Sequence, residues 1–451
     1  MTSTTLTKVV DCRPPFNLET DVLVVGGGAA GVAAAVTAAR HGARVVLLER
    51  YGFCGGGAVA GLSGTICGLY EASDNAADQP RQLVFGFADE FAKLLSQRSG
   101  LTPPIRYGKT FTRVHDPLVW REAADHLLRT AGVVVSLHTT VTEVLLDGGD
   151  RIAGVVAYTK QGKLAVRAKI TVDASGDADL AEMAGLGTHI GDNGLVQNPT
   201  MMFRLSGVDI PRFLDRHGKD SIMDQDVTDA IHKVNQRGEV TLPRSKVFLF
   251  ETPRPNELLC NATRLIGFDG RELNPVVAAD LTEAEFQGRL QVREYEKFFK
   301  QHIAGCESAY INDTGVQVGV RQTRQINGVE RLTNVAIAAG EKRSDGIARC
   351  PWPIELHSGE KPKLNWLFRD YYEVPYGCFV PNRGESLLAA GRCLSAEHEA
   401  VASARVTAQC FSYGHAVGIA AATSALEKVQ PRSLHGEDLR ARLNRENAGL
   451  D

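Results

Sequence analysis

A glycine-rich turn between a short apolar strand and an alanine-rich helix constrains the fold of this 451-residue chain more than any other feature. Residues 22–25 are continuously apolar, which is typical of a buried strand in a parallel sheet, and residues 29–41 form a proline-free, helix-favouring segment. A second apolar strand follows over residues 44–49. The turn itself has three glycines at the spacing of a tight strand-to-helix connection: Gly26, Gly28 and Gly31. This β-α-β unit predicts an α/β fold built on a parallel sheet.

Each glycine of this turn has a physical role in a dinucleotide site. The first permits the tight turn, the second lets a pyrophosphate approach bare backbone, and the third lets the helix pack against the strand. The helix N-terminus supplies unpaired N–H groups and the positive end of the helix dipole. Glu49, at the end of the second strand, is placed to accept hydrogen bonds from ribose hydroxyls, which disfavours a phosphorylated ribose. The turn therefore predicts a site for FAD or NAD.

Two further segments favour FAD over NAD. Residues 51–61 directly follow the acidic residue and are rich in glycine, so that a bulky group can lie against the backbone there. Near the C-terminus, apolar residues 386–390 run into Gly391, and a small-residue helix is expected over residues 404–426. The start of that helix would face the negative charge that develops on a reduced flavin. We therefore predict FAD as the cofactor, bound by a domain built from both ends of the chain.

Between about residues 186 and 380 the glycine-rich β-α-β signals stop, and short strands alternate with polar segments. The predicted domains are an N-terminal extension at 1–17, an FAD-binding domain at 18–185 and 381–428, an α+β substrate or cap domain at 186–380, and a C-terminal tail at 429–451. The predicted local elements are a helix at 118–130 capped by Asp116, a hairpin of strands 141–146 and 152–158, and a long helix at 282–303 with Phe286, Leu290, Phe298 and Ile303 at helical spacing.

The chain resembles the FAD-dependent oxidoreductases of the glutathione-reductase-like superfamily, nearest to a subgroup that ends in an Ala-Gly-Arg-Cys motif. The resemblance implies a Rossmann-like FAD-binding domain in which the parallel sheet carries a β-meander. It extends from about residue 18 to 425, and it is carried by segments 24–31 with Glu49, 52–57, 173–179, 319–324, 375–376, 390–400 and 405–407.

The resemblance also implies cofactor contacts. Val141 matches a position whose backbone meets the adenine, and Arg405 and Val406 match the pyrimidine edge of the flavin. Many superfamily members carry an acidic residue where Arg392 stands, so the usual hydrogen bond to the ribityl chain is not expected from it. The full set of predicted cofactor-binding residues is Gly26, Gly28, Ala30, Gly31, Glu49, Arg50, Gly55, Gly56, Val141, Ala174, Gly176, Gly391, Arg392, Arg405 and Val406.

Two features common in this superfamily are missing from the sequence. Its disulfide reductases carry two closely spaced cysteines after the second strand, whereas Cys54 stands alone here, thirteen residues before Cys67. A second Gly-x-Gly-x-x-Gly turn is also absent, which excludes a dedicated NAD(P)H domain of the usual kind. None of the nine cysteines forms a Cys-x-x-Cys pair, so no metal site is predicted.

Four side chains are candidates for catalysis. His357 and His398 can exchange protons near neutral pH, Tyr376 can donate a proton, and Arg321 can clamp a carboxylate. For each, a structural role is the alternative. The predicted reaction is hydride transfer between a small organic substrate and the flavin N5. A non-redox or structural use of FAD, and a flavin monooxygenase, remain alternatives.

Composition limits the partners. A net charge of −3 without charged tails argues against nucleic acid, and no apolar stretch is long enough to span a membrane. The N-terminal residues lack the pattern of a secretory signal, so a cytoplasmic enzyme is expected. The expected partners are a small-molecule substrate and an electron acceptor or donor, and a homo-oligomer is left open.

Overall fold

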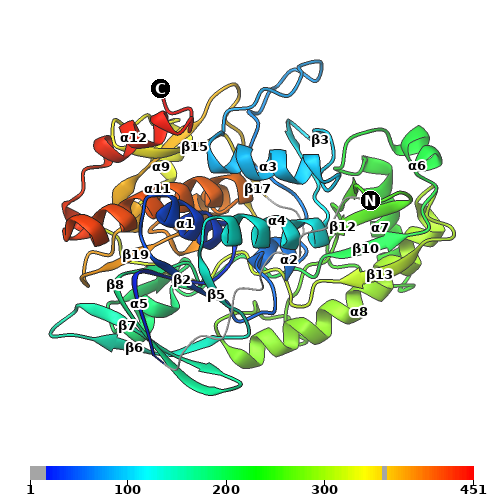
Figure 1. Cartoon of the computed structure of the whole chain (residues 1–451). Coiled ribbons are helices and arrows are strands. Elements are labelled where there is room, and N and C mark those ends of the chain that lie inside the picture. The colour runs from blue at the N-terminus through cyan, green and yellow to red at the C-terminus, as the bar shows by residue number, and fades with distance from the viewer. Residues whose placement is uncertain (1–16, 358–362) are drawn as a thin grey trace, which may run out of the picture.

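The computed structural model describes residues 17–357 and 363–451, so the predicted extension at 1–17 lies outside it except for Asn17. The largest sheet has seven strands in the order β5-β2-β1-β8-β7-β6, with β19 also paired to β8 (Figure 1). Its strands are β1 (Asn17–Val25), β2 (Val45–Leu48), β5 (Val134–Ser136), β6 (Thr140–Leu146), β7 (Ile152–Thr159), β8 (Gly162–Asp173) and β19 (Leu387–Ala389).

This sheet combines a parallel half with an antiparallel hairpin. Strands β1, β2, β5, β8 and β19 run parallel, with Leu23 opposite both Val46 and Thr171. The hairpin strands β6 and β7 extend the sheet beyond β8 in antiparallel order. The long strand β8 joins the halves, because residues 162–167 pair with β7 and residues 171–173 pair with β19. The predicted Rossmann-like sheet with a β-meander is therefore confirmed.

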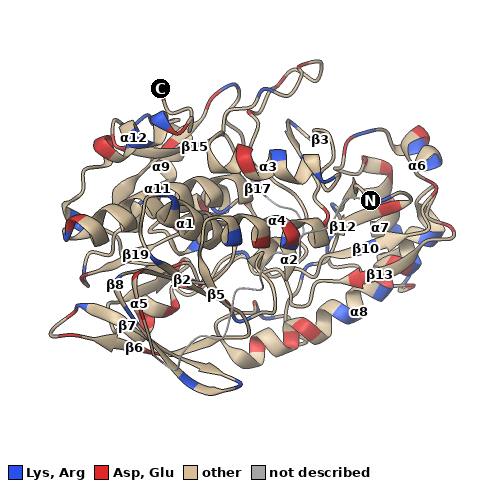
Figure 2. Ribbon diagram, in the orientation of Figure 1, with Lys and Arg blue, Asp and Glu red and all other residues tan. Residues whose placement is uncertain are grey.

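Two helices from opposite ends of the chain pack against each other beside the parallel strands. They are α1 (Ala29–Arg40) and α11 (Thr407–Glu427), and both ribbons are almost free of charged residues (Figure 2). An ideal Cβ on Gly414 would lie 2.2 Å from the carbonyl oxygen of Ala30, so glycine lets the two backbones meet. The helix predicted over 404–426 is therefore α11, which begins three residues later than predicted, and a separate short helix, α10 (His398–Ala404), precedes it.

Two more helices extend this layer. Helix α4 (Pro117–Thr130) begins where the sequence predicts, because the Asp116 carboxylate accepts a 2.7 Å hydrogen bond from the Leu118 N–H. Helix α3 (Phe87–Gln97) contacts both α4 and α11, and Phe91 packs against Trp120 with ring centroids 4.6 Å apart.

A smaller antiparallel sheet has its own hydrophobic core, formed by residues between Met201 and Val318. Its strand order is β11-β12-β10-β13. The elements of this part are β10 (Phe203–Ser206), α6 (Ile210–His217), α7 (Gln225–Gln236), β11 (Phe248–Glu251), β12 (Glu257–Asn261), α8 (Ala278–His302) and β13 (Tyr310–Thr314).

Helix α8 is the predicted long helix, but its buried face differs from the predicted one. Phe286 and Leu290 are 55% and 60% exposed, and only the predicted Phe298 and Ile303 are buried. In the first half of the helix the buried residues instead include Ala284 and Gly288. The helix approaches Met201 closely there, because an ideal Cβ on Gly288 would lie 2.8 Å from that side chain. The small residues set the contact, and charged residues are spread along the helix (Figure 2).

The second core covers a shorter stretch of sequence, 201–318, than the inserted domain predicted at 186–380. Buried apolar side chains within the described stretches 332–357 and 363–380 pack into the main core, where β15 (Gly346–Cys350) pairs with β18 (Tyr372–Pro375). The predicted tail at 429–451 holds α12 (Gly436–Arg445), whose buried leucines also join that core. In the described residues no helix is both long and apolar enough to cross a membrane.

The remaining elements are short. They are α2 (Gly56–Val59), β3 (Ile105–Tyr107), β4 (Thr110–Thr112), α5 (Asp179–Met183), β9 (Thr188–Ile190), β14 (Arg324–Ile326), α9 (Asn334–Ala338), β16 (Ile354–Leu356), β17 (Lys363–Asn365) and the 3₁₀ helices η1 (Tyr376–Phe379), η2 (Gly391–Cys393) and η3 (Pro431–Ser433).

Candidate cofactor and substrate site

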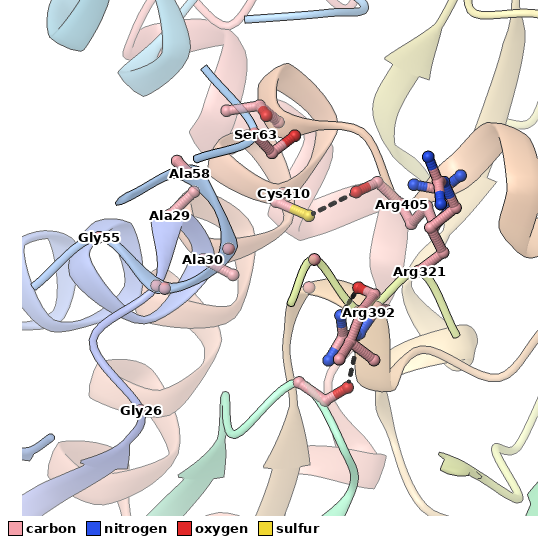
Figure 3. Close-up of a pocket in the computed structure, with 18 of the residues that line it drawn as sticks. Gly26, Ala29, Ala30, Gly55, Ala58, Ser63, Arg321, Arg392, Arg405 and Cys410 are labelled. Carbon is pink, nitrogen blue, oxygen red and sulfur yellow. Dashed lines mark hydrogen bonds between the residues drawn. The ribbon is translucent and has the colours of Figure 1, made fainter. Parts of the chain in front are cut away.

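One long cavity runs from the carboxyl ends of the central strands toward the small sheet. Gly26, Glu49 and Val141 line one end, and Phe250 and His357 line the other. Figure 3 shows the glycine turn on one side of this pocket and Arg321 and Arg405 on the other. Of the fifteen residues predicted to bind the cofactor, every one except Gly31 lines the cavity.

The three glycines of the turn have different surroundings. Gly26 has a φ of +100°, and an ideal Cβ there would lie 2.3 Å from the Ala174 carbonyl oxygen. Gly31 packs α1 onto the turn, since its Cβ would lie 1.8 Å from the Gly26 oxygen. In front of Gly28, by contrast, the nearest atom to such a Cβ is the Gly56 Cα at 3.8 Å. Space is therefore left open at the glycine expected to meet a pyrophosphate.

The N-terminus of α1 is free to bind an anion. No side chain caps it, and its first internal hydrogen bond runs from Val32 N–H to Gly28 O at 2.9 Å. Among the described residues, the N–H groups of Ala29, Ala30 and Gly31 therefore have no acceptor. Helix α11 also begins at the cavity without a side-chain cap. Both helices turn a positive dipole end toward the cavity.

Glu49 fixes the shape of the nucleotide end. Its two carboxylate oxygens accept hydrogen bonds from the Gly27 N–H at 2.6 Å and the Tyr51 N–H at 2.9 Å. Burial raises the pKa of Glu49, while these backbone donors favour its charged form. Beside it, Arg50 lies over the Tyr51 ring and donates to Gln317 Oε1 at 3.2 Å.

Arg392 braces the middle of the cavity. Its guanidinium donates to the Gly176 carbonyl oxygen at 2.8 Å, to Asp177 Oδ1 at 2.8 Å and to the Val320 carbonyl oxygen. These bonds hold the loop that follows β8 against the 319–324 segment, and Figure 3 shows Arg392 in the pocket lining. Arg392 therefore has a structural role here, which accounts for an arginine at a position where many superfamily members carry an acidic residue.

The inner end of the cavity holds a buried network of ionisable side chains. The Tyr107 hydroxyl donates to Glu355 Oε1 at 2.7 Å, and His357 Nε2 lies 3.3 Å from the same oxygen. Burial raises the pKa of Glu355, but its contact with His357, the hydrogen bond from Tyr107 and the charge of Arg405 outweigh it and lower the value to about 2. Burial and the charge of Arg321 lower the pKa of His357 to about 3. At neutral pH the carboxylate is therefore ionised and the imidazole is neutral.

The sequence identifies His357 as a candidate but not Glu355 or Tyr107, which form the network with it. Glu355 stands two residues earlier on β16, and alternation along a strand places residues i and i+2 on one face, which is a signal that could have identified it. Tyr107 comes from β3 and lies 248 residues before Glu355 in the chain, so no local sequence pattern links the two.

Two predicted catalytic residues lie outside the cavity, and the structure corrects those predictions. The Tyr376 hydroxyl is buried and donates to the Pro431 carbonyl oxygen at 3.0 Å. His398 begins α10 beside Gly191, and its Nδ1 has no partner among the described residues. After Gly391 the chain turns through η2 and runs between the 332 and 378 segments, which carries His398 away from the cavity.

A family model for FAD-dependent oxidoreductases matches residues 21–443. The chain belongs to the FAD-dependent oxidoreductase family. This protein is therefore an enzyme with FAD as its cofactor, and the unpaired N–H groups of α1 opposite the open space at Gly28 fit a pyrophosphate. The placement in a glutathione-reductase-like subgroup, and its C-terminal motif, stay predictions.

Solved structures share the fold of this FAD-dependent oxidoreductase. A geranylgeranyl bacteriochlorophyll reductase-like protein from Thermoplasma acidophilum aligns with a TM-score of 0.51 and 14% identity, over 96% of this chain and 85% of that one. The p-nitrophenol 4-monooxygenase from Pseudomonas putida DLL-E4 aligns with a TM-score of 0.50 and 13% identity, over 96% and 87%. A comparison with curated proteins found no match.

Proposed function

We propose that this FAD-dependent oxidoreductase transfers a hydride between a small organic substrate and the flavin N5, with His357 exchanging the accompanying proton. The supporting observation is the network of Tyr107, Glu355 and His357, which lies in the same cavity as the elements that fit FAD. FAD, when bound, supplies the two-electron acceptor or donor. The chain's own residues supply the position of the substrate and the path of the proton.

The proton balance assigns each residue a task. Oxidation of a substrate group H–C–X–H breaks the C–H bond, whose electron pair leaves with that hydrogen, and the X–H bond, whose proton goes to a base. His357 is neutral and can take that proton at a ring nitrogen. The Glu355 carboxylate, 3.3 Å from Nε2, stabilises the imidazolium that results. In the reverse direction the imidazole, which is neutral at neutral pH, first takes up a proton from solvent and then donates it to the substrate.

The cysteines support a reaction without a redox dithiol. All eight cysteines in the described residues are free. Burial raises the pKa of Cys54 far above its usual value and that of Cys67 to about 11, so neither is a ready thiolate. We therefore infer that the second electron partner is a small molecule or protein that reaches the flavin directly.

The test is to mix the FAD-loaded protein anaerobically with panels of alcohols, amines and organic acids. Reduction is measured as bleaching of the flavin absorbance. With a donor identified, His357→Gln should slow bleaching by about 100-fold, which is typical of losing a general base. His126→Gln, an exposed histidine on α4, should leave the rate unchanged. If no donor bleaches the flavin, the proposed reaction is wrong. Bleaching by NADPH followed by oxygen-dependent hydroxylation would indicate a monooxygenase instead.

A further inference from the structure

We propose that Arg321 and Arg405 bind the carboxylate of a small organic acid with an apolar body, and that this acid is the substrate. The binding site stands on the geometry of the inner end of the cavity alone. Only the acid's role as substrate rests on the proposed function.

The inner end of the cavity has more positive than negative charge. Arg321 and Arg405 line it together with the Glu355 carboxylate, and Arg244, which does not itself line the cavity, is close enough for its charge to act on Arg321. Arg321 and Arg244 are only 7% and 3% exposed. Burial, then the charges of Arg405 and Arg244, lower the pKa of Arg321. Because unpaired buried charge is costly, this arrangement favours a bound anion that offsets it.

The arginines also have hydrogen-bond donors to spare. Arg321 uses one nitrogen, Nη1, to donate to the Asn198 carbonyl oxygen at 2.6 Å. Arg405 donates from Nη2 to Gln197 Oε1 at 3.1 Å, and its buried Nε has no partner among the described residues. The buried Trp352 Nε1, on the same cavity, is unpartnered as well within the described chain. A ligand that brings acceptor oxygens would satisfy these groups.

The two guanidinium groups are held near each other from different elements. Arg321 follows the Gly319-Val320 segment and Arg405 directly follows α10, yet their side chains are anchored on the consecutive residues 198 and 197. Figure 3 shows their side chains converging on the same part of the pocket, apart from Arg392. Planar guanidinium groups match the two oxygens of a carboxylate and bind it in a fixed orientation.

Three aromatic side chains and a methionine line the same cavity as this pair. Tyr107 stacks with Phe250 at a centroid distance of 5.8 Å and lies 5.3 Å from Trp352, and all three line the cavity with Met202. Aromatic faces and a thioether favour an apolar or planar body over a hydrated ion. The aromatic side chains that line the cavity with the two arginines therefore favour an organic acid over inorganic phosphate.

The experiment is titration of the FAD-loaded protein with benzoate, benzamide and inorganic phosphate, followed by calorimetry and by perturbation of the flavin absorbance. We expect benzoate to bind and benzamide to bind at least tenfold more weakly, because the amide is uncharged and replaces an acceptor with a donor. Phosphate should bind at least tenfold more weakly than benzoate. Arg321→Gln and Arg405→Gln should each weaken benzoate binding at least tenfold. Arg216→Gln, an exposed arginine on α6, should have no effect.

The FAD content and melting temperature of each variant separate a lost site from a lost fold, and Arg321→Lys, which keeps the charge, should recover part of the affinity. Equal binding of benzoate and benzamide, benzoate binding unchanged in both glutamine variants, or no binding of benzoate would overturn the proposal. Benzoate binding in a protein whose flavin no donor reduces would support the anion site and reject the proposed reaction. Flavin reduction only by donors without a carboxylate would support the proposed reaction and overturn the assignment of the acid as its substrate.

Discussion

At the scale of single residues, the Glu355 carboxylate organises the inner end of the cavity. One of its oxygens accepts from Tyr107 and lies against His357, and the charge of Arg405 adds to its stabilisation. The folded-state pKa of about 2 lies below the ordinary value of 4.5. A carboxyl group with a lowered pKa stabilises the fold above its unfolded-state pKa, and this contribution is lost as the pH falls toward the folded-state value.

We therefore expect Glu355→Gln to lower the free energy of unfolding by about 2 kcal/mol at pH 7, the scale of a hydrogen bond to a charged group. The difference from the unmodified protein should shrink as the pH falls from about 4.5 toward 2. Urea unfolding at pH 7 and pH 3 measures this. The exposed Glu122→Gln on α4 is the control and should change little at either pH. An effect of equal size at both pH values would contradict the assignment of charge.

Sequence reasoning was strongest where a residue's role depends on its neighbours in the chain. The turn glycines and Glu49 lie on one β-α-β unit, whose local geometry a motif specifies. Tyr107 was missed because its partner comes from a distant strand. His398 was assigned to the site by its nearness in sequence to Gly391, but a single turn of η2 is enough to direct the following residues elsewhere.

At the scale of elements, the packing of α1 against α11 positions the start of the cofactor site. Ideal Cβ atoms on Gly414 and Gly418 would lie 2.2 and 2.7 Å from carbonyl oxygens of α1. The first of those oxygens belongs to Ala30, which itself lines the cavity. The separation of the helices therefore controls where the α1 N-terminus lies.

Gly414→Val should push the two helices apart, since the added atoms have no space. We expect a loss of about 2 kcal/mol in stability, in the range for overpacked cores, together with a lower ratio of bound FAD to protein. Thermal unfolding and the FAD released on denaturation measure both. Glu427→Val adds the same side chain at the exposed end of α11 and serves as the control. Full FAD content in the Gly414 variant would show that the helix contact does not position the site.

Element positions were predicted well wherever a cap or a turn marks them, as for α4 at Asp116 and for the hairpin of β6 and β7. The buried face of α8 was predicted wrongly. Large apolar side chains were taken to mark it, whereas Gly288 and Ala284 let the helix approach the core closely. A close contact made through small residues leaves no hydrophobic periodicity to read.

At the scale of the whole molecule, a single carboxylate ties the C-terminal segment to both helices of the cofactor layer. Glu446 follows α12, and its two oxygens lie 2.6 Å from His41 Nε2 and 2.7 Å from His415 Nε2. These hydrogen bonds hold the pKa of Glu446 well below its usual range. The predicted tail is thus part of the fold, which composition could not show because its few leucines are spaced among charges.

We expect Glu446→Gln to reduce stability at pH 7 by about 1 kcal/mol, a figure discounted because the side chain is partly exposed. The lowered pKa means that the difference should disappear as the pH falls below about 4.5, where the unfolded chain takes up the proton. Melting temperatures across that pH range test this, and the exposed Glu437→Gln on α12 is a nearby control. A difference that grows at low pH would contradict the charge assignment.

The pairing of β19 with β8, and of α11 with α1, also has a consequence for biosynthesis. The glycine turn emerges from the ribosome before β19 and α11, which follow roughly tens of seconds later at ordinary rates of translation. During that interval the nascent chain has the glycine turn but lacks β19 and α11, which complete the cofactor site. We therefore expect FAD to be retained only once α11 has been synthesised. A product truncated before β19 should be colourless.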